Sequence, residues 1–164
     1  MEKGLKILNG TFEVALRLLA ILSTCRISMT VERIAIYSYF CIYLTDYDEN
    51  EKSLHPKIPF RNASFINSKE VIHNAIELLL SKGLIEIDLS ETLFKISASE
   101  LGSALYDQID GTYKDKLVNN IIKAHHLFSK KTDKMLYDFV YNNMSKWGSE
   151  FSYESVIKEI GYEE

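Results

Sequence analysis

The side chains best able to bind a metal ion are few in this chain and widely separated. It contains four histidines and two cysteines. His125 and His126 are adjacent, so on a helix their side chains would point about 100° apart and could not share one ion. The other histidines and the cysteines show neither Cys-x-x-Cys nor His-Glu-x-x-His spacing, which are common zinc-binding arrangements. The pattern therefore does not favour a metal centre.

The residues that could act in catalysis are equally dispersed. The seven glycines are scattered and form no phosphate-binding loop, and no serine or cysteine lies in a recognisable nucleophile motif. The carboxylates fall mostly on polar helix faces, where solvated charge is the common explanation. We therefore expect a protein that is not an enzyme, with no catalytic, metal-binding or cofactor-binding residues and no cofactor.

Composition indicates a cytoplasmic, soluble protein. The 164 residues are 46% hydrophobic and 26% charged, which is ordinary for a globular protein with one domain and a helical extension. The net charge of −4 provides no overall attraction for nucleic acid. The longest apolar stretch, Phe12–Leu22, contains two charged residues and is too short to span a bilayer. With no secretory signal, Cys25 and Cys41 are expected to be buried, reduced thiols.

One helix and the hairpin that follows it organise the rest of the chain. Asn67 and Glu70 form a capping box at the start of this helix, and Gly83 is placed to end it in the left-handed conformation. The hydrophobic spacing then changes from helical to alternating, which predicts two strands at Leu84–Asp88 and Leu93–Ile96. A helix followed directly by a two-stranded hairpin is typical of the end of a winged-helix domain.

Winged helices often bind DNA through their third helix and their wing. The exposed face of the predicted third helix offers Lys69, His73 and Asn74 for such contacts. However, residues 67–96 contain three lysines and five acidic residues, a net charge of −2, which is the wrong sign for binding phosphates. We therefore expect DNA contact to be weak, or to occur only through a larger complex.

Further helices are predicted on both sides of this unit. After a lead-in at Met1–Gly10, Thr11 caps a helix that runs to Thr24 and has Phe12 on its buried side. A second helix starts at Thr30, and its inner stripe includes Cys41 and Leu44.

After the hairpin, Ser97 and Glu100 form a capping box. The inner face of the following helix is predicted to contain Leu101, Ala104, Leu105 and Ile109. Residues 113–147 form either one bent helix or two, since Thr132 is a possible cap within them. A short helix at Tyr153–Ile160 ends the chain.

The long irregular segment 46–66 is the best candidate for a partner interface. It contains both prolines of the chain and several apolar residues, and loops of this length in compact domains are often functional. The candidate interface residues are His55, Pro56, Pro59, Phe60 and Arg61 in the loop, with Tyr39 and Tyr43 in the second helix. A structural interpretation stays open beside this one. In it the prolines shape the loop, Arg61 pairs with a nearby acid, and the tyrosines pack in the core.

Three motifs occur in an order that matches a known family. They are "SLHPKIPFR" at Ser53–Arg61, "LLLSKGLIEI" at Leu78–Ile87 and "ASELGSALYDQIDGTYKDKL" at Ala98–Leu117. Together they resemble the middle component, of the second type, of bacterial ABC-three-component systems. Lamassu-type anti-phage and anti-plasmid systems are similar in arrangement. The resemblance implies a small winged-helix adaptor that works beside an SMC- or Rad50-like ABC ATPase and a separate effector, and it implies no catalytic residue.

The sequence thus predicts a mainly α fold. A winged-helix domain of three helices and a two-stranded β-hairpin wing occupies residues 1–110, with a long loop at 46–66, and a C-terminal helical extension at 111–164 packs on it. The expected function is a non-catalytic adaptor subunit of an antiviral or anti-plasmid defence complex, bridging the ATPase and an effector such as a nuclease. Its expected partners are those two proteins, and no membrane is involved. The alternative is a winged-helix DNA-binding transcriptional regulator.

Overall fold

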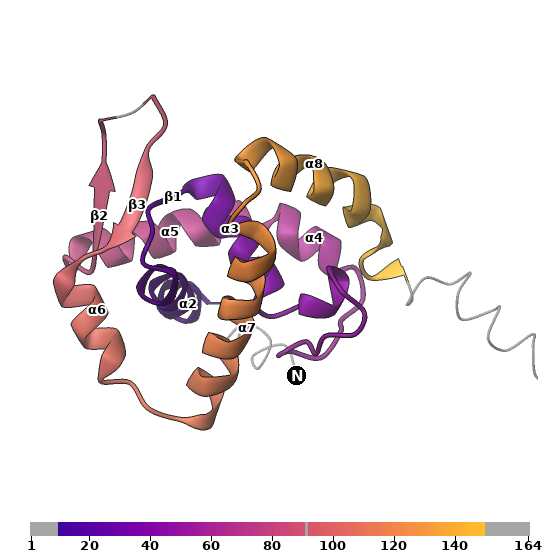
Figure 1. Ribbon diagram of the computed structural model, residues 1–164, viewed down its shortest axis with the longest axis horizontal. Coiled ribbons are helices and arrows are strands. Elements are labelled where there is room, and N and C mark those ends of the chain that lie inside the picture. Colours follow the sequence, from indigo (N-terminus) through magenta and orange to yellow (C-terminus); the bar gives the residue numbers. More distant parts are fainter. Residues whose placement is uncertain (1–9, 91, 150–164) are drawn as a thin grey trace, which may run out of the picture.

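The computed structural model describes residues 10–90 and 92–149, and Figure 1 shows their arrangement. The helices are α2 (Thr11–Cys25), α3 (Val31–Phe40), α4 (Arg61–Ile66), α5 (Ser68–Ser81), α6 (Glu100–Asp107), α7 (Thr112–Phe128) and α8 (Asp133–Asn143), with 3₁₀ turns at Leu44–Asp46 and Met144–Lys146. The strands are β1 (Met29–Thr30), β2 (Ile85–Asp88) and β3 (Lys95–Ala98). The fold is mainly α, as predicted. The helix expected at Tyr153–Ile160 and the lead-in before Gly10 lie outside the described residues.

Helix α2 lies at the centre of the molecule and is seen end-on in Figure 1, with α3, α5, α6 and α7 packed around it. Leu18, Leu19 and Ile21 have no exposed surface, so this helix is the middle of the core. Its first turn differs from the prediction. Gly10 occupies the N-cap position and makes no side-chain capping bond, and Phe12, which was predicted to be buried, is 69% exposed.

Helix α5 and the β2–β3 hairpin confirm the predicted helix and hairpin, although the second strand runs over Lys95–Ala98, two residues later than predicted. The buried face of α5 consists of Ile72, Ala75, Ile76 and Leu79, and Gly83 ends the helical segment with φ of +66°. The predicted Asn67 cap is wrong. The Asn67 backbone N–H donates to Ala63 O (2.9 Å) at the end of α4, so its backbone is already helical and its side chain makes no capping bond. The short helix α4 therefore runs almost directly into α5.

The hairpin belongs to a three-stranded antiparallel sheet with the order β1-β3-β2. Within β2 and β3, Ile85 lies opposite Ala98 and Ile87 lies opposite Ile96. Strand β1, which the sequence does not predict, adds only Met29 and Thr30 to the other edge of β3. A strand of two residues is too short to show the alternation that identifies strands in a sequence.

Helix α6 begins two residues later than predicted and buries a different face. Its cap is Ser99, whose hydroxyl accepts a hydrogen bond from Gly102 N (2.9 Å), whereas Ser97 lies within β3. The buried residues of α6 are Gly102 and Tyr106, and the predicted inner residues Leu101, Ala104 and Leu105 are exposed. The reason is close packing, because a Cβ at Gly102 would lie 1.9 Å from Leu84 O.

Residues 113–147 form two helices, α7 and α8, and not one bent helix. Thr132 caps α8, since its hydroxyl accepts from Met135 N (3.2 Å). Beside this cap, Asp133 accepts hydrogen bonds from Thr30 Oγ1 (2.6 Å) and Arg33 Nε (2.5 Å). Arg33 also donates to the carbonyl groups of residues 128 and 131. The start of α3 is thereby joined to the connection between α7 and α8.

An aromatic cluster joins α3 to the C-terminal helices. Tyr39 stacks on Trp147 with ring centroids 4.9 Å apart and an interplanar angle of 23°. Phe40 packs edge-on against Trp147 (5.4 Å) and also contacts Phe128 (5.3 Å). Since Tyr39, Phe40, Phe128 and Trp147 are all buried, α3 and the C-terminal part of the described chain share one core. Within the described residues no helix is both long and apolar enough to cross a membrane.

Candidate protein interface

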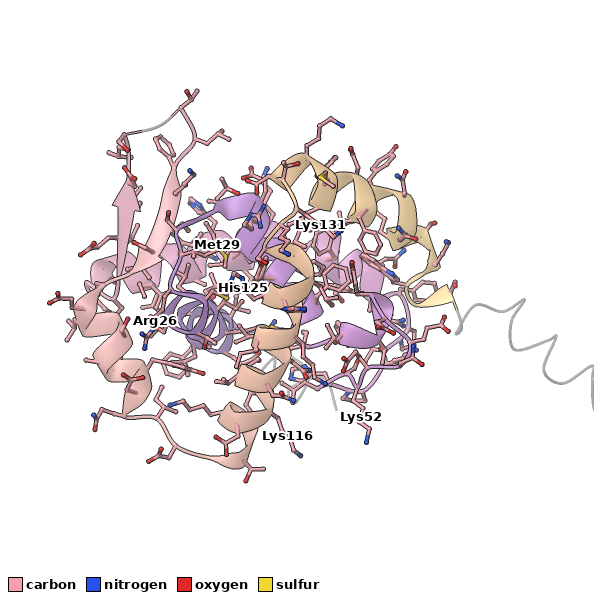
Figure 2. All side chains as sticks on the ribbon, viewed as in Figure 1. Arg26, Met29, Lys52, Lys116, His125 and Lys131 are labelled. Carbon is pink, nitrogen blue, oxygen red and sulfur yellow. The ribbon has the colours of Figure 1, made fainter. Side chains whose placement is uncertain are left out.

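The loop between the 3₁₀ turn at residues 44–46 and α4 lies along α7 and is attached to it at successive points. Lys123 forms an ion pair with Glu51 (2.5 Å), and Asn120 Nδ2 donates to the Lys52 carbonyl oxygen (3.3 Å). The side chain of Lys52 itself points away from the molecule (Figure 2). These contacts, with Asn120 buried, fix the path of a segment that has no regular secondary structure. We refer to residues 47–60 as the strap.

His55 makes the third attachment of the strap. Its Nε2 lies 2.8 Å from the hydroxyl of Tyr113, in the first turn of α7, and its backbone N–H donates to Ile42 O (3.2 Å). Burial, followed by the charge of Arg17, lowers the pKa of His55, so the ring is neutral near pH 7. A neutral ring can donate or accept in the bond to Tyr113. His55 therefore serves as an attachment of the strap and keeps part of its surface exposed.

The two ends of the strap are closed by a buried ion pair. Arg61 donates to Asp46 twice, from Nε to Oδ2 (2.7 Å) and from Nη2 to Oδ1 (2.5 Å), and each of the two side chains is 3% exposed. Tyr39 completes the group by donating its hydroxyl to Asp46 Oδ2 (2.6 Å). Burial, and then the hydrogen bond to Asp46, raises the pKa of Tyr39 well above its ordinary value. The paired guanidinium and carboxylate compensate each other's charge in the interior.

The structure thus separates the predicted interface residues into two groups. Arg61, Tyr39 and Tyr43 are between 2% and 6% exposed, so in this chain they support the strap from beneath and offer almost no surface to a partner. Pro56 and Pro59 are exposed, and Phe60 is 62% exposed. Direct partner contact by any of these residues stays a prediction, and the side chains with surface available for it are His55, which is half-buried, Pro56, Pro59 and Phe60.

The backbone conformation of Phe60 directs its side chain toward solvent. It adopts a left-handed conformation with φ of +53°, which is uncommon for a non-glycine residue. Gly148 packs directly on this position, since a Cβ there would lie 2.5 Å from Phe60 N and 2.8 Å from Arg61 N. The chain after α8 therefore supports the backbone that presents the Phe60 ring to solvent.

The α5 residues considered for DNA contact are all at the surface. Lys69, His73 and Asn74 are exposed on one side of the helix. His73 Nε2 lies 3.3 Å from a carboxylate oxygen of Glu77 on the next turn, so the nearest acid to this histidine is on the same surface. The helix carries one lysine, Lys69, and two glutamates, Glu70 and Glu77, so these residues form no uniformly basic surface.

Comparison with protein families decides the identity of the chain. The family model for the ABC-three component (ABC-3C) system Middle Component 2 matches residues 7–150. The chain belongs to this family. No curated protein and no solved structure matches it.

One half-buried histidine of this middle component, His125, has a structural environment. His125 Nδ1 lies 3.2 Å from the hydroxyl of Tyr37, so this histidine, labelled in Figure 2, joins α7 to α3. Burial, and then the charge of Arg33, lowers the pKa of His125. In the ranges 10–90 and 92–149, no group of three or more His, Cys, Asp or Glu side chains could hold a metal ion.

The residues that fix the strap of this middle component are those that sequence reasoning missed. Asn120 and Lys123 each bind a strap residue from α7, and Asp46 binds Arg61 at the start of α4. One sequence signal was present, since Asn120 lies on the same face of α7 as Leu117 and Ile121, where a polar residue requires a partner. The partners of Asn120 are the carbonyl groups of Cys41 and Lys52, 79 and 68 positions earlier, and their identity depends on the tertiary fold.

Proposed function

We propose that this middle component is a non-catalytic adaptor that bridges an SMC- or Rad50-like ABC ATPase and an effector, such as a nuclease, in an antiviral or anti-plasmid defence complex. Membership of the family supports a role beside the other components of an ABC-three-component system. The observation that carries the proposal for this chain is the strap. It is fixed from beneath by buried polar contacts, and it ends in an exposed phenylalanine.

The strap has the features of a docking surface that is organised before binding. Its path is fixed by α7, which lowers the conformational entropy lost when a partner binds. Aromatic residues are enriched in the centres of protein interfaces, and Phe60 is the aromatic side chain that the strap exposes most. We assign this surface, formed by His55, Pro56, Pro59 and Phe60, to the ATPase.

We also propose that this mainly α fold contains a winged-helix domain. The order of helices, followed by α5 and the β2–β3 hairpin, with β1 as a third strand, supports it. Residues 1–110 would form this unit and residues 111–164 the C-terminal extension. The extension contributes to the same core, because Phe128 and Trp147 pack on α3.

The rival function is a DNA-binding regulator that uses α5 and the hairpin. The exposed Lys69, His73 and Asn74 favour it, whereas the acidic Glu86 and Asp88 on β2 oppose it. A fluorescence anisotropy titration of the full chain with duplex DNA at about 150 mM salt separates the two functions. Nanomolar affinity for one sequence would replace the adaptor proposal by the regulator.

The direct test is co-expression of the full chain with the ATPase and effector of its own system. We expect the wild type to co-purify with both, and Phe60→Ser to reduce recovery of the ATPase at least tenfold. Leu101→Ser is the matched control, because Leu101 on α6 is 60% exposed, close to the 62% of Phe60. Neither variant should change the melting temperature. Failure of the wild type to bind either component, or equal ATPase recovery by both variants, would contradict the proposal.

A further inference from the structure

The β2–β3 hairpin carries apolar side chains that become progressively more exposed toward its turn. At its base, Ile85 and Ile96 are 4% and 2% exposed, while Ile87 is 40% exposed. Leu89 and Phe94, which directly follow β2 and precede β3, are 67% and 63% exposed. Figure 1 shows this end of the hairpin projecting beyond the helices. Clustered exposed apolar side chains of this size are typical of interaction sites.

The register places these residues on one face of the hairpin. Ile85 pairs with Ala98 and Ile87 with Ile96, and by strand alternation Leu89 and Phe94 continue the same face. The opposite face holds Glu86 and Asp88, which lie opposite Ser97 and Lys95. The hairpin thus has an apolar face that continues the core outward and a second face that is polar and mainly acidic.

The acidic side chains also occupy an open edge. Strand β2 is the outer strand of the sheet, and both Glu86 and Asp88 are exposed on it. Asp88 accepts a hydrogen bond from the backbone N–H of Ser90 (2.8 Å), and hydrogen bonding to Ser90 lowers the pKa of Asp88, which keeps it ionised. Charged residues on an edge strand oppose pairing with an identical strand.

We propose that the apolar face of the hairpin, centred on Ile87, Leu89 and Phe94, docks into an apolar groove bordered by lysine or arginine on another protein of the complex. Charge complementarity selects this occupant. A second copy of the chain would bring the acidic edges together, and DNA phosphates would be repelled by the same carboxylates. The floor of such a groove would cover the apolar side chains, and the lysine or arginine at its border would reach Glu86 and Asp88 around the open edge of β2.

The position of the hairpin indicates which component it binds. In Figure 1 the hairpin lies at one end of the molecule, and α4, which begins directly after the strap, lies toward the other end. Two partners can therefore be held at once without overlapping. In the proposed adaptor function the strap binds the ATPase. The assignment of the hairpin to the effector rests on that function.

The test is the double variant Leu89→Ser/Phe94→Ser in the full chain, co-expressed with the ATPase and effector of the same system. We expect effector recovery to fall at least tenfold while ATPase recovery and the melting temperature stay unchanged. Leu101→Ser is the matched control, since Leu101 is 60% exposed on α6. A second variant, Glu86→Lys/Asp88→Lys, should weaken effector binding and remove part of its salt dependence.

Three results would overturn the inference. The first is that the serine variant recovers both components as well as the wild type does, or that it loses binding of the ATPase alone. The second is a wild-type dimer in light scattering that becomes a monomer in the serine variant, which would make a second copy the occupant. The third is duplex DNA binding that the serine variant loses. If the wild type binds neither component, the adaptor proposal itself fails, so the two failures are distinguishable.

Discussion

Replacing Arg61 by alanine tests whether the strap is supported by a buried ion pair. The sequence motif alone suggests a surface arginine whose loss would affect binding more than folding. The structure indicates the reverse, because the Arg61 guanidinium donates twice to Asp46 and is 3% exposed. Arg61→Ala would leave the Asp46 carboxylate buried without its countercharge.

The size of the effect follows from this burial. Breaking a buried ion pair by removing one partner costs about 3–5 kcal/mol. For a chain of this length each kcal/mol lowers the melting temperature by about 2–4 °C, which predicts a decrease of about 6–20 °C. The Tyr39 hydroxyl still donates to Asp46 (2.6 Å), so we expect a value in the lower half of this range.

Thermal unfolding followed by circular dichroism, together with denaturant titration, provides the measurement. The double variant Arg61→Ala/Asp46→Asn gives a matched control, since its amide still accepts from Tyr39 and carries no charge. It should be more stable than Arg61→Ala by at least about 1 kcal/mol. An Arg61→Ala protein that melts like the wild type, or a double variant that is less stable than Arg61→Ala, would refute the reasoning.

Two further predictions concern the C-terminal helices. Gly148→Ala should destabilise the fold by about 1–3 kcal/mol in denaturant titration, because φ of Gly148 is +88° and the new Cβ would clash with Phe60 N. Gly83→Ala is the control, since its Cβ would enter open space, and it should lower the free energy of unfolding by less. The pKa of Asp133 is lowered: burial acts to raise it, and the hydrogen bonds from Thr30 and Arg33 outweigh burial. The ionised Asp133 carboxylate therefore stabilises the folded state at neutral pH, and this stabilisation is lost as the pH falls through the lowered pKa. The difference in the free energy of unfolding between wild type and Asp133→Asn should accordingly shrink between about pH 5 and pH 3. A difference that grows on acidification would contradict this assignment.

The helix and hairpin at residues 67–96 could be predicted because their signals are local. The change from helical to alternating spacing and the glycine at position 83 are contained within one short stretch, and Gly83 indeed has φ of +66°. The buried helix faces were predicted wrongly at Phe12 and Leu101, because the signal that decides them is not local. Which side of a helix is buried depends on its neighbours, and both side chains point away from the core, at 69% and 60% exposure.

The candidate site was predictable only in part. The prolines and Phe60 mark the strap as unusual, yet the ion pair of Arg61 joins residues 15 positions apart and the Arg33–Asp133 pair joins residues 100 apart. The sequence offers several acidic residues that could form an ion pair with each arginine, and only the three-dimensional path of the chain selects between them. The apolar hairpin face was missed because a pattern of alternation predicts a strand without showing where its core ends.

The pairing of Tyr39 with Trp147 has a consequence for synthesis of the protein. A ribosome releases the chain from its N-terminus, so α3 emerges long before the segment that covers it. Until residue 147 has been made, the apolar rings of α3 lack their final contacts, and until α7 has been made the strap lacks Asn120 and Lys123. Only a completed chain can then present the Phe60 surface in its fixed form. Prematurely ended chains would stay recognisable to chaperones and proteases, and they would not compete for places in the assembly.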